Sequence, residues 1–416
     1  MKKLISLRCD YDNFLKITEN IHLAFQKKYW VNLIAKEEQP FIFPEDILDN
    51  GPGIVIQTGG STGGSKKCFH TIENLNQSAI CTGLWLKEQG INPEDCIIFN
   101  PLPINHISGL MPWWRCKVWD AKHVKITKEI MKSPTKINEF YNDYFIEESR
   151  PKVISIVPTH LIRLISHRIG QKLLKSFDII WVGGAKLNDS IAAEARELGL
   201  RLSPCYGATE TASMVSALSP SEFLAGENNC GSPLPDVELG INENGLLKTK
   251  TSRLCIGKLI NNNYETIRDQ DGWWTSGDIA RFEKNNGKKK LKILGRIDNV
   301  VNCGGETIFL DELENRFMKD AKISKLKVLN ISFIPKQNKE WGQRIIGLVE
   351  LEGNNYKFIN KELLKKLNAI VSHWDSIEKP DKWFIYPSIN SEHNKISRKR
   401  LQELIIKEQQ ANHGEN

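Results

Sequence analysis

Residues 58–66 read Thr-Gly-Gly-Ser-Thr-Gly-Gly-Ser-Lys, and they follow the apolar run Ile54-Val55-Ile56. A short β-branched run of this kind predicts a buried strand. The glycines after it let the backbone approach a ligand closely, and the hydroxyls and Lys66 supply donors and positive charge. Such a loop suits a polyphosphate, because bare backbone N–H groups can point at its oxygens. Ser65 stands where the ordinary P-loop needs lysine, and a flexible turn is the alternative interpretation.

Further apolar runs alternate with helical patterns, as in Thr71–Gln89 and Ser190–Leu198. Strands that alternate with helices predict a parallel sheet with helices on its faces, and ligands bind beyond the carboxyl ends of such strands. The glycine-rich loop, Gly183-Gly184-Ala185 and Tyr206–Thr211 each follow a strand, which favours a ligand site there. The other predicted strands of this α/β layer are Ile97–Phe99, Val153–Val157, Ile179–Val182 and Arg201–Cys205.

The remaining segments indicate three parts. Residues 1–50 form a reduced amino-terminal segment, in which Asn20–Lys36 carries apolar residues at helical spacing. Residues 51–297 form the large domain, and recurrent glycines predict a small β subdomain at about 230–297. Residues 298–416 alternate helical and strand patterns, which predicts a small α+β domain.

Composition narrows the class of protein. The chain has 416 residues, a net charge of +7 and 26% charged residues, as in globular proteins. No apolar run of about 18 residues is present, so we expect no membrane insertion, and Arg8, Asp10 and Asp12 interrupt the amino-terminal apolar stretch, which argues against a secretory signal. The nine cysteines form no C-x-x-C pair, which favours a reducing, cytoplasmic location. Basic runs such as Lys288–Lys290 are interpreted as solvated surface and not as a nucleic-acid site, because aromatic residues do not interleave with them.

Five motifs in order give the chain, from about Ile54 to Leu401, a resemblance to the adenylate-forming superfamily of acyl- and aryl-CoA ligases, luciferases and adenylation domains. They are Thr58–Lys66, Tyr206–Thr211, Trp274–Asp278, Gly295–Asp298 and Asn394–Arg398. The resemblance implies two half-reactions, in which a carboxylate and ATP give acyl-AMP and a thiol then displaces AMP. It also implies Mg²⁺ as a cofactor, CoA as a co-substrate and a small carboxyl-terminal domain that moves as a lid.

The resemblance further implies roles for single residues. Lys395 would be the catalytic lysine between the carboxylate and the α-phosphate, Thr209 would lie near that phosphate, and Glu210 would bind Mg²⁺. Asp278 would accept from the ribose hydroxyls, Arg296 would assist at the ribose or phosphate, and Asp298 would be the hinge, with a plain turn residue as the alternative. The other cofactor-binding candidates are Thr58, Gly60, Ser61, Thr62, Gly63 and Lys66 for the outer phosphates, Gly183, Gly184 and Ala185 under adenine, and Tyr206 and Gly207.

Within this superfamily the chain most resembles the 2-succinylbenzoate–CoA ligases of menaquinone and phylloquinone synthesis. Pro101–Leu110, Ser155–Thr159 and Cys205–Ala212 carry this resemblance, which implies o-succinylbenzoate as the acid. A dicarboxylate needs a partner for its non-reacting carboxylate. His106, Ser108 and Thr159 are the candidates, and His106 is also a candidate catalytic residue, although a structural histidine is the alternative.

The chain departs from the superfamily pattern in three places. Asn394 replaces the usual glycine before the catalytic lysine, Gly64-Ser65 replaces a common Lys-Pro, and the glycine-rich loop comes unusually early. Other aryl- or acyl-CoA ligases, a stand-alone enzyme that loads a carrier protein, and a nucleotide-binding protein without turnover stay open as alternatives. A homodimer also stays open.

Overall fold

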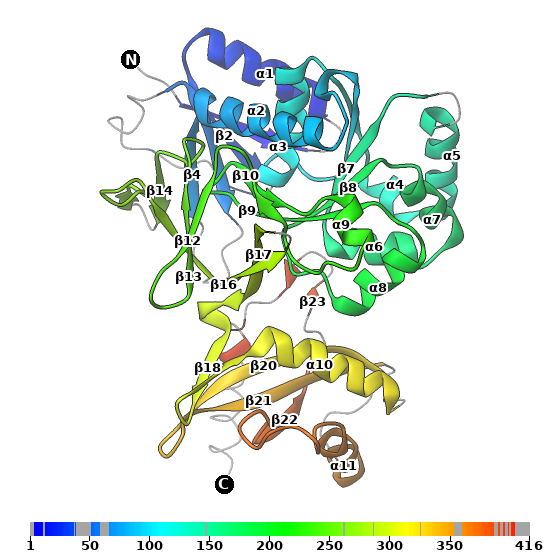
Figure 1. Ribbon diagram of the computed structural model, residues 1–416, viewed down its shortest axis with the longest axis vertical. Helices are drawn as coiled ribbons and strands as arrows, with labels where there is room; N and C mark the ends of the chain where they lie inside the picture. The colour runs from blue at the N-terminus through cyan, green and yellow to red at the C-terminus, as the bar shows by residue number, and fades with distance from the viewer. Residues whose placement is uncertain are drawn as a thin grey trace. The chain divides into compact units, whose positions relative to one another are not determined.

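The computed structural model divides into two compact units (Figure 1). The larger unit holds the described residues up to Ile293 except Gly277–Ile279, and the smaller holds Gly277–Ile279 and the described residues from Leu294 onward. None of the described helices is long and apolar enough to cross a bilayer. The residues that the structure describes are 4–10, 13–36, 38, 51–58, 66–145, 148–260, 263–285, 287–324, 326–352, 360–386, 390–391, 394–395, 398 and 401–403.

A seven-stranded sheet lies in the larger unit, in the order β11-β10-β9-β8-β7-β5-β6. Strands β5 to β9 are parallel to one another, and β10 and β11 are antiparallel at one edge. The predicted parallel layer of an α/β protein is therefore confirmed. The bounds are β5 Ile97–Asn100, β6 Lys122–Lys125, β7 Lys152–Ile156, β8 Ile179–Val182, β9 Leu202–Ala208, β10 Ser213–Ala217 and β11 Ser232–Pro233.

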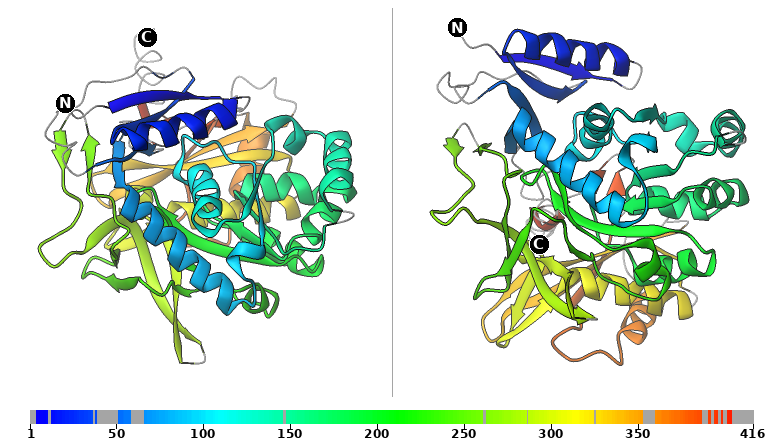
Figure 2. Two further views of the ribbon diagram at one scale, coloured as in Figure 1. Left: turned by 90° about the horizontal axis from the view of Figure 1, so that it is seen from above. Right: turned by 45° about the horizontal axis from the view of Figure 1, so that its top comes forward.

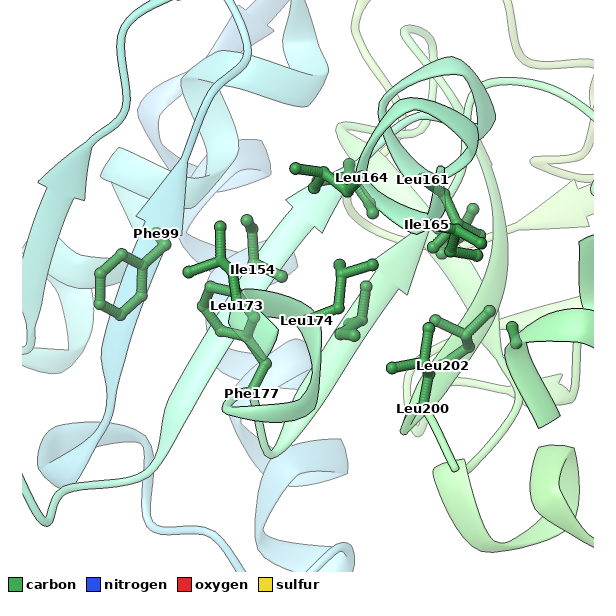
Figure 3. Packing of buried hydrophobic residues seen from close by; sticks show 14 of the residues in the cluster. Phe99, Ile154, Leu161, Leu164, Ile165, Leu173, Leu174, Phe177, Leu200 and Leu202 are labelled. Carbon is green, nitrogen blue, oxygen red and sulfur yellow. The ribbon is translucent and has the colours of Figure 1, made fainter. Parts of the chain in front are cut away.

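Helices cover both faces of this sheet, because its central strands are apolar on both sides. Phe99 and Ile154 pack under α4 to α9, whereas Ile98 and Val153 pack under α2 and α3. Figure 3 shows side chains of α6 and α7 gathered over Ile154 and Phe99. The bounds are α2 Ile72–Glu88, α3 Ile107–Trp119, α4 Lys128–Lys132, α5 Pro134–Phe145, α6 Pro158–Ile165, α7 Arg168–Lys175, α8 Asp189–Glu197 and α9 Pro220–Leu224, with a short turn η3 at Pro93–Asp95.

The amino-terminal residues form a second sheet, which differs from the helix predicted over Asn20–Lys36. Helix α1 ends at Gln26, Lys28 takes a left-handed φ of 56°, and Trp30 to Ile34 are buried as a strand between two neighbours. Their burial outweighs the helical spacing. Figure 2 shows α1 lying along the first strands of the chain. This six-stranded sheet has the order β1-β2-β3-β4-β14-β15. Its bounds are β1 Leu4–Cys9, α1 Phe14–Gln26, β2 Trp30–Ala35, β3 Gly53–Thr58, β4 Lys66–Thr71, β14 Gly257–Ile260 and β15 Asn263–Glu265.

The strand before the glycine-rich loop is part of this second sheet, which corrects the expectation that it belongs to the parallel layer. β3 and β4 are antiparallel neighbours, and Thr58 pairs with Lys66 at their ends. The loop therefore joins two strands, and the predicted helix follows the second of them. That helix, α2, begins at a capping box between Thr71 and Asn74, at the start of the predicted range Thr71–Gln89.

Short antiparallel strands follow in the region predicted as a β subdomain. Four of them form a sheet in the order β12-β13-β16-β17. β14 pairs with β4 and so extends the amino-terminal sheet instead. The bounds are β12 Glu238–Ile241, β13 Leu246–Lys250, β16 Trp274–Asn285 and β17 Lys288–Arg296, followed by the turn η4 at Ile297–Asn299.

The smaller unit is a sheet with two helices packed on one face. The order is β19-β18-β21-β20, with β22 also paired to β21. Phe317 of α10, Leu367 of α11 and Phe333 of β20 share one core, while Ile334 and Leu401 pack on the opposite face. The alternation of helices and strands predicted for this part is present among its described residues. The bounds are β18 Val300–Cys303, β19 Glu306–Phe309, α10 Leu310–Ile323, β20 Val328–Asn338, β21 Gly342–Leu351, α11 Lys361–Ile370, β22 Lys382–Ile385, β23 Asn390–Ser391 and β24 Asn394–Lys395.

Candidate active site

Loops from four neighbouring strands meet at the carboxyl edge of the parallel sheet. β5, β7, β8 and β9 are adjacent and parallel, so the segments that follow them leave the sheet on the same side. Ligands of parallel sheets bind at this edge. The predicted site residues that the structure places there are His106 and Ser108 after β5, Thr159 after β7, Gly183, Gly184 and Ala185 after β8, and Tyr206, Gly207, Thr209 and Glu210 in and after β9.

The turn after β9 is tight and strained. The buried Thr211 hydroxyl accepts from the N–H of Ala208 at 2.9 Å and donates to the carbonyl of Ser213 at 2.7 Å. Ala212 and Ser213 have positive φ values of 50° and 87°. Side chains rarely adopt such backbone, which clusters at functional sites where surrounding contacts maintain it. The turn therefore holds Thr209, just before it, in a fixed place.

Gly207 is required by a close approach between β9 and β10. A Cβ at this position would lie 2.2 Å from the carbonyl oxygen of Ser213 and 2.5 Å from the Cα of Met214. Any side chain would force the two strands apart. Gly207 is exposed, and because it has no side chain, a flat ligand can contact its backbone closely.

A hydrogen bond ties this loop to the hairpin of β3 and β4. The His70 ring, which is fully buried on β4, has its Nε2 2.7 Å from the carbonyl oxygen of Thr209. Burial lowers the pKa of His70 to about 4, and the bond to Thr209 opposes that shift. The ring is therefore neutral near pH 7, and Nε2 carries the proton that Thr209 accepts. The N–H of Cys255 donates to the Glu210 carbonyl at 2.9 Å, which fixes the next residue.

Residues Gly183 to Ala185 form a shelf beside this loop. The N–H of Gly183 donates to the carbonyl of Ile156 at 3.2 Å, and a Cβ at Gly183 would come within 3.1 Å of the Cys205 sulfur. Gly184 has a φ of 81°, which favours glycine. Gly184 and Ala185 are exposed. The shelf offers a side-chain-poor backbone of the kind on which a planar ring lies.

Only the ends of the predicted phosphate loop are described. Thr58 and Lys66 are half-buried partners at the end of the β3–β4 hairpin. Gly60, Ser61, Thr62 and Gly63 lie outside the described residues.

The candidates for the acid pocket differ in their surroundings. His106 precedes α3 and is exposed, and its ring makes no hydrogen bond to any described residue. Partial burial nevertheless lowers its pKa, although the carboxylate of Glu38 opposes the shift. Ser108 is half-buried in the first turn of α3, and Thr159 is exposed in the first turn of α6.

Arg115 is a functional candidate that the sequence analysis missed. It is 2% exposed, its Nη2 donates to the Ser213 hydroxyl at 3.3 Å, and its Nε has no hydrogen-bond partner. The guanidinium stacks on Trp181 with 5.0 Å to the ring centroid, and no described carboxylate pairs with it. Burial lowers its pKa to about 9. The sequence does not single it out, because both Arg115 and Lys117 interrupt the apolar segment Ile107–Trp119 and only the structure shows which of them is buried.

A chain of ion pairs links the predicted nucleotide and hinge residues of the smaller unit. Arg296 donates to Asp278 at 3.4 Å and to Asp298 at 3.2 Å. Gly277 leaves the space for this guanidinium, since a Cβ there would lie 2.8 Å from Nη2. The backbone of Lys395 lies in β24, where it pairs with Asn390.

Glu210 is suited to bind a divalent ion whose other ligands are phosphate oxygens of a nucleotide. Its carboxylate makes no hydrogen bond or ion pair to a described residue. The described residues contain no group of three or more metal-ligating side chains. Mg²⁺ in nucleotide enzymes usually takes one or two carboxylates together with phosphate oxygens, and a lone half-buried carboxylate is consistent with that donor set.

Comparison with known proteins agrees with this arrangement. The AMP-binding enzyme family matches residues 17–258. A 2-succinylbenzoate–CoA ligase of Escherichia coli (strain K12) is 28% identical over 360 residues, which cover 85% of this chain and 69% of that protein. An o-succinylbenzoate CoA synthetase of Bacillus subtilis, solved with its acyl-adenylate intermediate, has the same fold, with a TM-score of 0.76, 20% identity and coverage of 96% of this chain and 88% of that one. Because the family match covers more than half of the sequence, the chain belongs to the AMP-binding enzyme family.

Proposed function

We propose that this protein is an AMP-forming acid–thiol ligase that activates 2-succinylbenzoate with ATP and transfers the acyl group to CoA. The curated relative in Escherichia coli and the solved synthetase of Bacillus subtilis both carry that activity in their names. The observation in this chain that carries the choice of acid is the buried Arg115 guanidinium without a carboxylate partner among the described residues.

Arg115 suits the non-reacting carboxylate of a dicarboxylate acid. A buried cation without an acid is costly, and an incoming carboxylate offsets that cost through a charge-assisted hydrogen bond. Arg115 lies beside Ser213, the first residue of β10, which pairs with the β9 residues that the nucleotide would contact. A monocarboxylate of similar size would leave the guanidinium unpaired, so the site discriminates by charge. His106, Ser108 and Thr159 are proposed as further polar contacts for the acid.

The nucleotide contacts follow from the shape of the sheet edge. Adenine would lie on the shelf of Gly183, Gly184 and Ala185, bordered by Tyr206 and Gly207. The Thr209 hydroxyl would reach the α-phosphate, and the loop between Thr58 and Lys66 would hold the outer phosphates. In the smaller unit, the Asp278 carboxylate would accept from the ribose hydroxyls, with Arg296 close by at 3.4 Å.

The first half-reaction brings two anions together, so its barrier is largely electrostatic. The acid carboxylate attacks the α-phosphorus and pyrophosphate leaves. The Lys395 ammonium would lie between the two reacting groups and stabilise the charge that shifts in the transition state. Mg²⁺ bound at Glu210 would supply further positive charge at the phosphates. The CoA thiol then attacks the acyl carbonyl and releases AMP.

Asp298 would be the pivot between these two steps. A hinge needs a few residues that absorb a change in φ and ψ, and the exposed Asp298 lies in the short turn η4, close in sequence to Leu294, where the smaller unit begins. The reaction would take place in the cytoplasm, where ATP and CoA are available and where the nine free thiols of this chain stay reduced.

Pyrophosphate release over a panel of acids tests the proposal. The panel contains 2-succinylbenzoate, its analogue with the benzoate carboxylate removed, benzoate and a medium-chain fatty acid, each with and without CoA. We expect 2-succinylbenzoate to be the one acid of the panel that causes pyrophosphate release. When CoA is added, we also expect its CoA thioester. Acid-dependent release without thioester would indicate loading of another thiol, and release with every acid except the dicarboxylate would exclude the proposed substrate.

A further inference from the structure

Arg398 is a nearly buried cation three residues beyond Lys395. Its side chain is 9% exposed. Nη2 donates to Asp311 at 2.8 Å and to Glu314 at 2.6 Å, and Nε donates to the carbonyl of Phe333 at 3.0 Å. These three acceptors fix the guanidinium in one place, because it is charged and has both of its donor edges occupied.

The acceptors belong to two rigid elements of the smaller unit. Asp311 and Glu314 lie one turn apart on α10 and therefore on the same face of the helix. The Glu314 carboxylate also accepts from the N–H of Phe333 at 2.9 Å, which ties α10 to β20. Arg398 is thus anchored where a helix and a strand meet in the core of this unit.

Asp311 also contacts the hinge turn. Its Oδ1 accepts from Arg398, and its Oδ2 accepts from the side-chain amide of Asn299 at 3.1 Å. Asn299 closes the turn η4 and follows Asp298 directly. One carboxylate therefore holds the segment after Lys395 with one oxygen and the hinge turn with the other.

We propose that Arg398 is a positioning residue for Lys395. It anchors the chain three residues beyond Lys395 to α10, and through Asp311 it connects that anchor to the hinge turn, so that the backbone of the lysine and the turn move together. Three residues span at most about 11 Å, so an anchored Arg398 keeps the backbone of Lys395 within that distance of α10. The inference rests on the proposed function, because Lys395 needs positioning only if it acts at the α-phosphate.

The Arg398→Lys variant tests this role. It keeps the charge but loses the forked geometry. A misplacement of about 1 Å at a reacting centre costs roughly 100-fold, so we expect acyl-AMP formation from ATP and 2-succinylbenzoate to slow by about 10- to 100-fold. The KM for ATP and the conversion of supplied acyl-AMP to thioester should stay within about threefold, since Lys395 acts only in the first step. Arg316→Lys is the matched control, because Arg316 on α10 pairs with Glu378 at 2.8 Å and contacts none of the candidate site residues that the structure describes.

A double-variant cycle separates positioning from general stability. If Arg398 acts through Lys395, the Lys395→Ala, Arg398→Lys double variant forms acyl-AMP no more slowly than Lys395→Ala alone. Additive losses would overturn the inference, as would a normal rate for Arg398→Lys. If Lys395→Ala itself forms acyl-AMP at the normal rate, the proposed role of the lysine fails first. Should Arg398→Lys not fold, as judged by its thermal unfolding, Asp311→Asn gives the same test, because it weakens the anchor without changing its size.

Discussion

The Nε2 atom of His70 lies 2.7 Å from the carbonyl oxygen of Thr209, and this bond joins the β3–β4 hairpin to the loop that carries Thr209 and Glu210. The two segments come from different sheets. Because the His70 ring is fully buried and its Nδ1 has no hydrogen-bond partner, the ring cannot accept a second proton without cost. The connection therefore depends on pH.

We expect His70 to make the free energy of unfolding fall in acid. Its pKa is about 4 in the folded protein and 6.5 in the unfolded chain, so the unfolded state binds more protons between these values. The contribution of His70 to the free energy of unfolding is fully present above pH 6.5 and is lost as the pH falls towards 4. The loss is on the order of 3 kcal/mol. Denaturant titrations of His70→Gln at several pH values should show a shallower fall. His373→Gln, which changes an exposed histidine, should show the same pH dependence as the wild type. If the free energy of unfolding of His70→Gln falls with pH as steeply as that of the wild type, the fall does not come from His70.

Arg115→Met should separate substrate affinity from stability. Loss of a charge-assisted hydrogen bond of about 1.5–3 kcal/mol should raise the KM for 2-succinylbenzoate by roughly 10- to 100-fold and leave the KM for ATP within about twofold. The free energy of unfolding should stay the same or increase, because a buried cation without a described acid partner is removed.

Arg253→Met is the contrasting variant for Arg115→Met. Arg253 is fully buried and paired with Asp236, so its removal leaves a partly buried carboxylate without its cation and should cost about 3–5 kcal/mol. An equal loss of stability in both variants, with an unchanged KM for the acid in Arg115→Met, would show that Arg115 is structural.

Gly207→Ala should damage both folding and nucleotide binding. The added methyl group would lie 2.2 Å from the Ser213 carbonyl oxygen, and forcing β9 and β10 apart should cost about 1–3 kcal/mol. We expect a lower unfolding temperature and a higher KM for ATP. Gly240→Ala is the control, since the nearest atom to its added methyl group is 3.6 Å away. A Gly207→Ala protein with normal stability and normal KM would contradict the close packing.

Lys395→Ala should abolish acyl-AMP formation without weakening nucleotide binding. Removal of one preorganised donor at a transition state costs about 10²- to 10³-fold, and the lysine is proposed to act there and not in the ground state. The rate is measured by rapid quench, and ATP affinity by calorimetry. Lys361→Ala, a surface lysine at the start of α11, should behave as the wild type. A comparable fall in ATP affinity would assign Lys395 to binding instead.

The sequence predicts the parallel layer well because its strands are buried on both faces and so are apolar throughout. The run Ile179–Val182 is an example, and the observed β8 has the same bounds. The predicted helix Thr71–Gln89 likewise differs from the observed α2 by one residue at each end, because the Thr71 side chain caps the helix by accepting from the N–H of its third residue.

The sequence fails where tertiary contacts override local pattern. Trp30 to Ile34 have helical spacing with the residues before them, yet their pairing with β1 and β3 makes them a strand. The strand before the glycine-rich loop is β-branched like its parallel counterparts, so only its pairing with Lys66–Thr71 reveals a second sheet. Arg115 and His70 became candidates only through their burial, and burial of a single polar residue has no signature in one sequence.

The most direct test of the central claim is to mix the wild-type protein with ATP, Mg²⁺ and 2-succinylbenzoate in the absence of CoA, quench with acid and measure the enzyme-bound products by mass spectrometry. The account predicts one 2-succinylbenzoyl-AMP for each pyrophosphate released, and full conversion of this anhydride to 2-succinylbenzoyl-CoA when CoA is added before the quench. ATP that stays intact, or pyrophosphate that appears without the mixed anhydride, would contradict it.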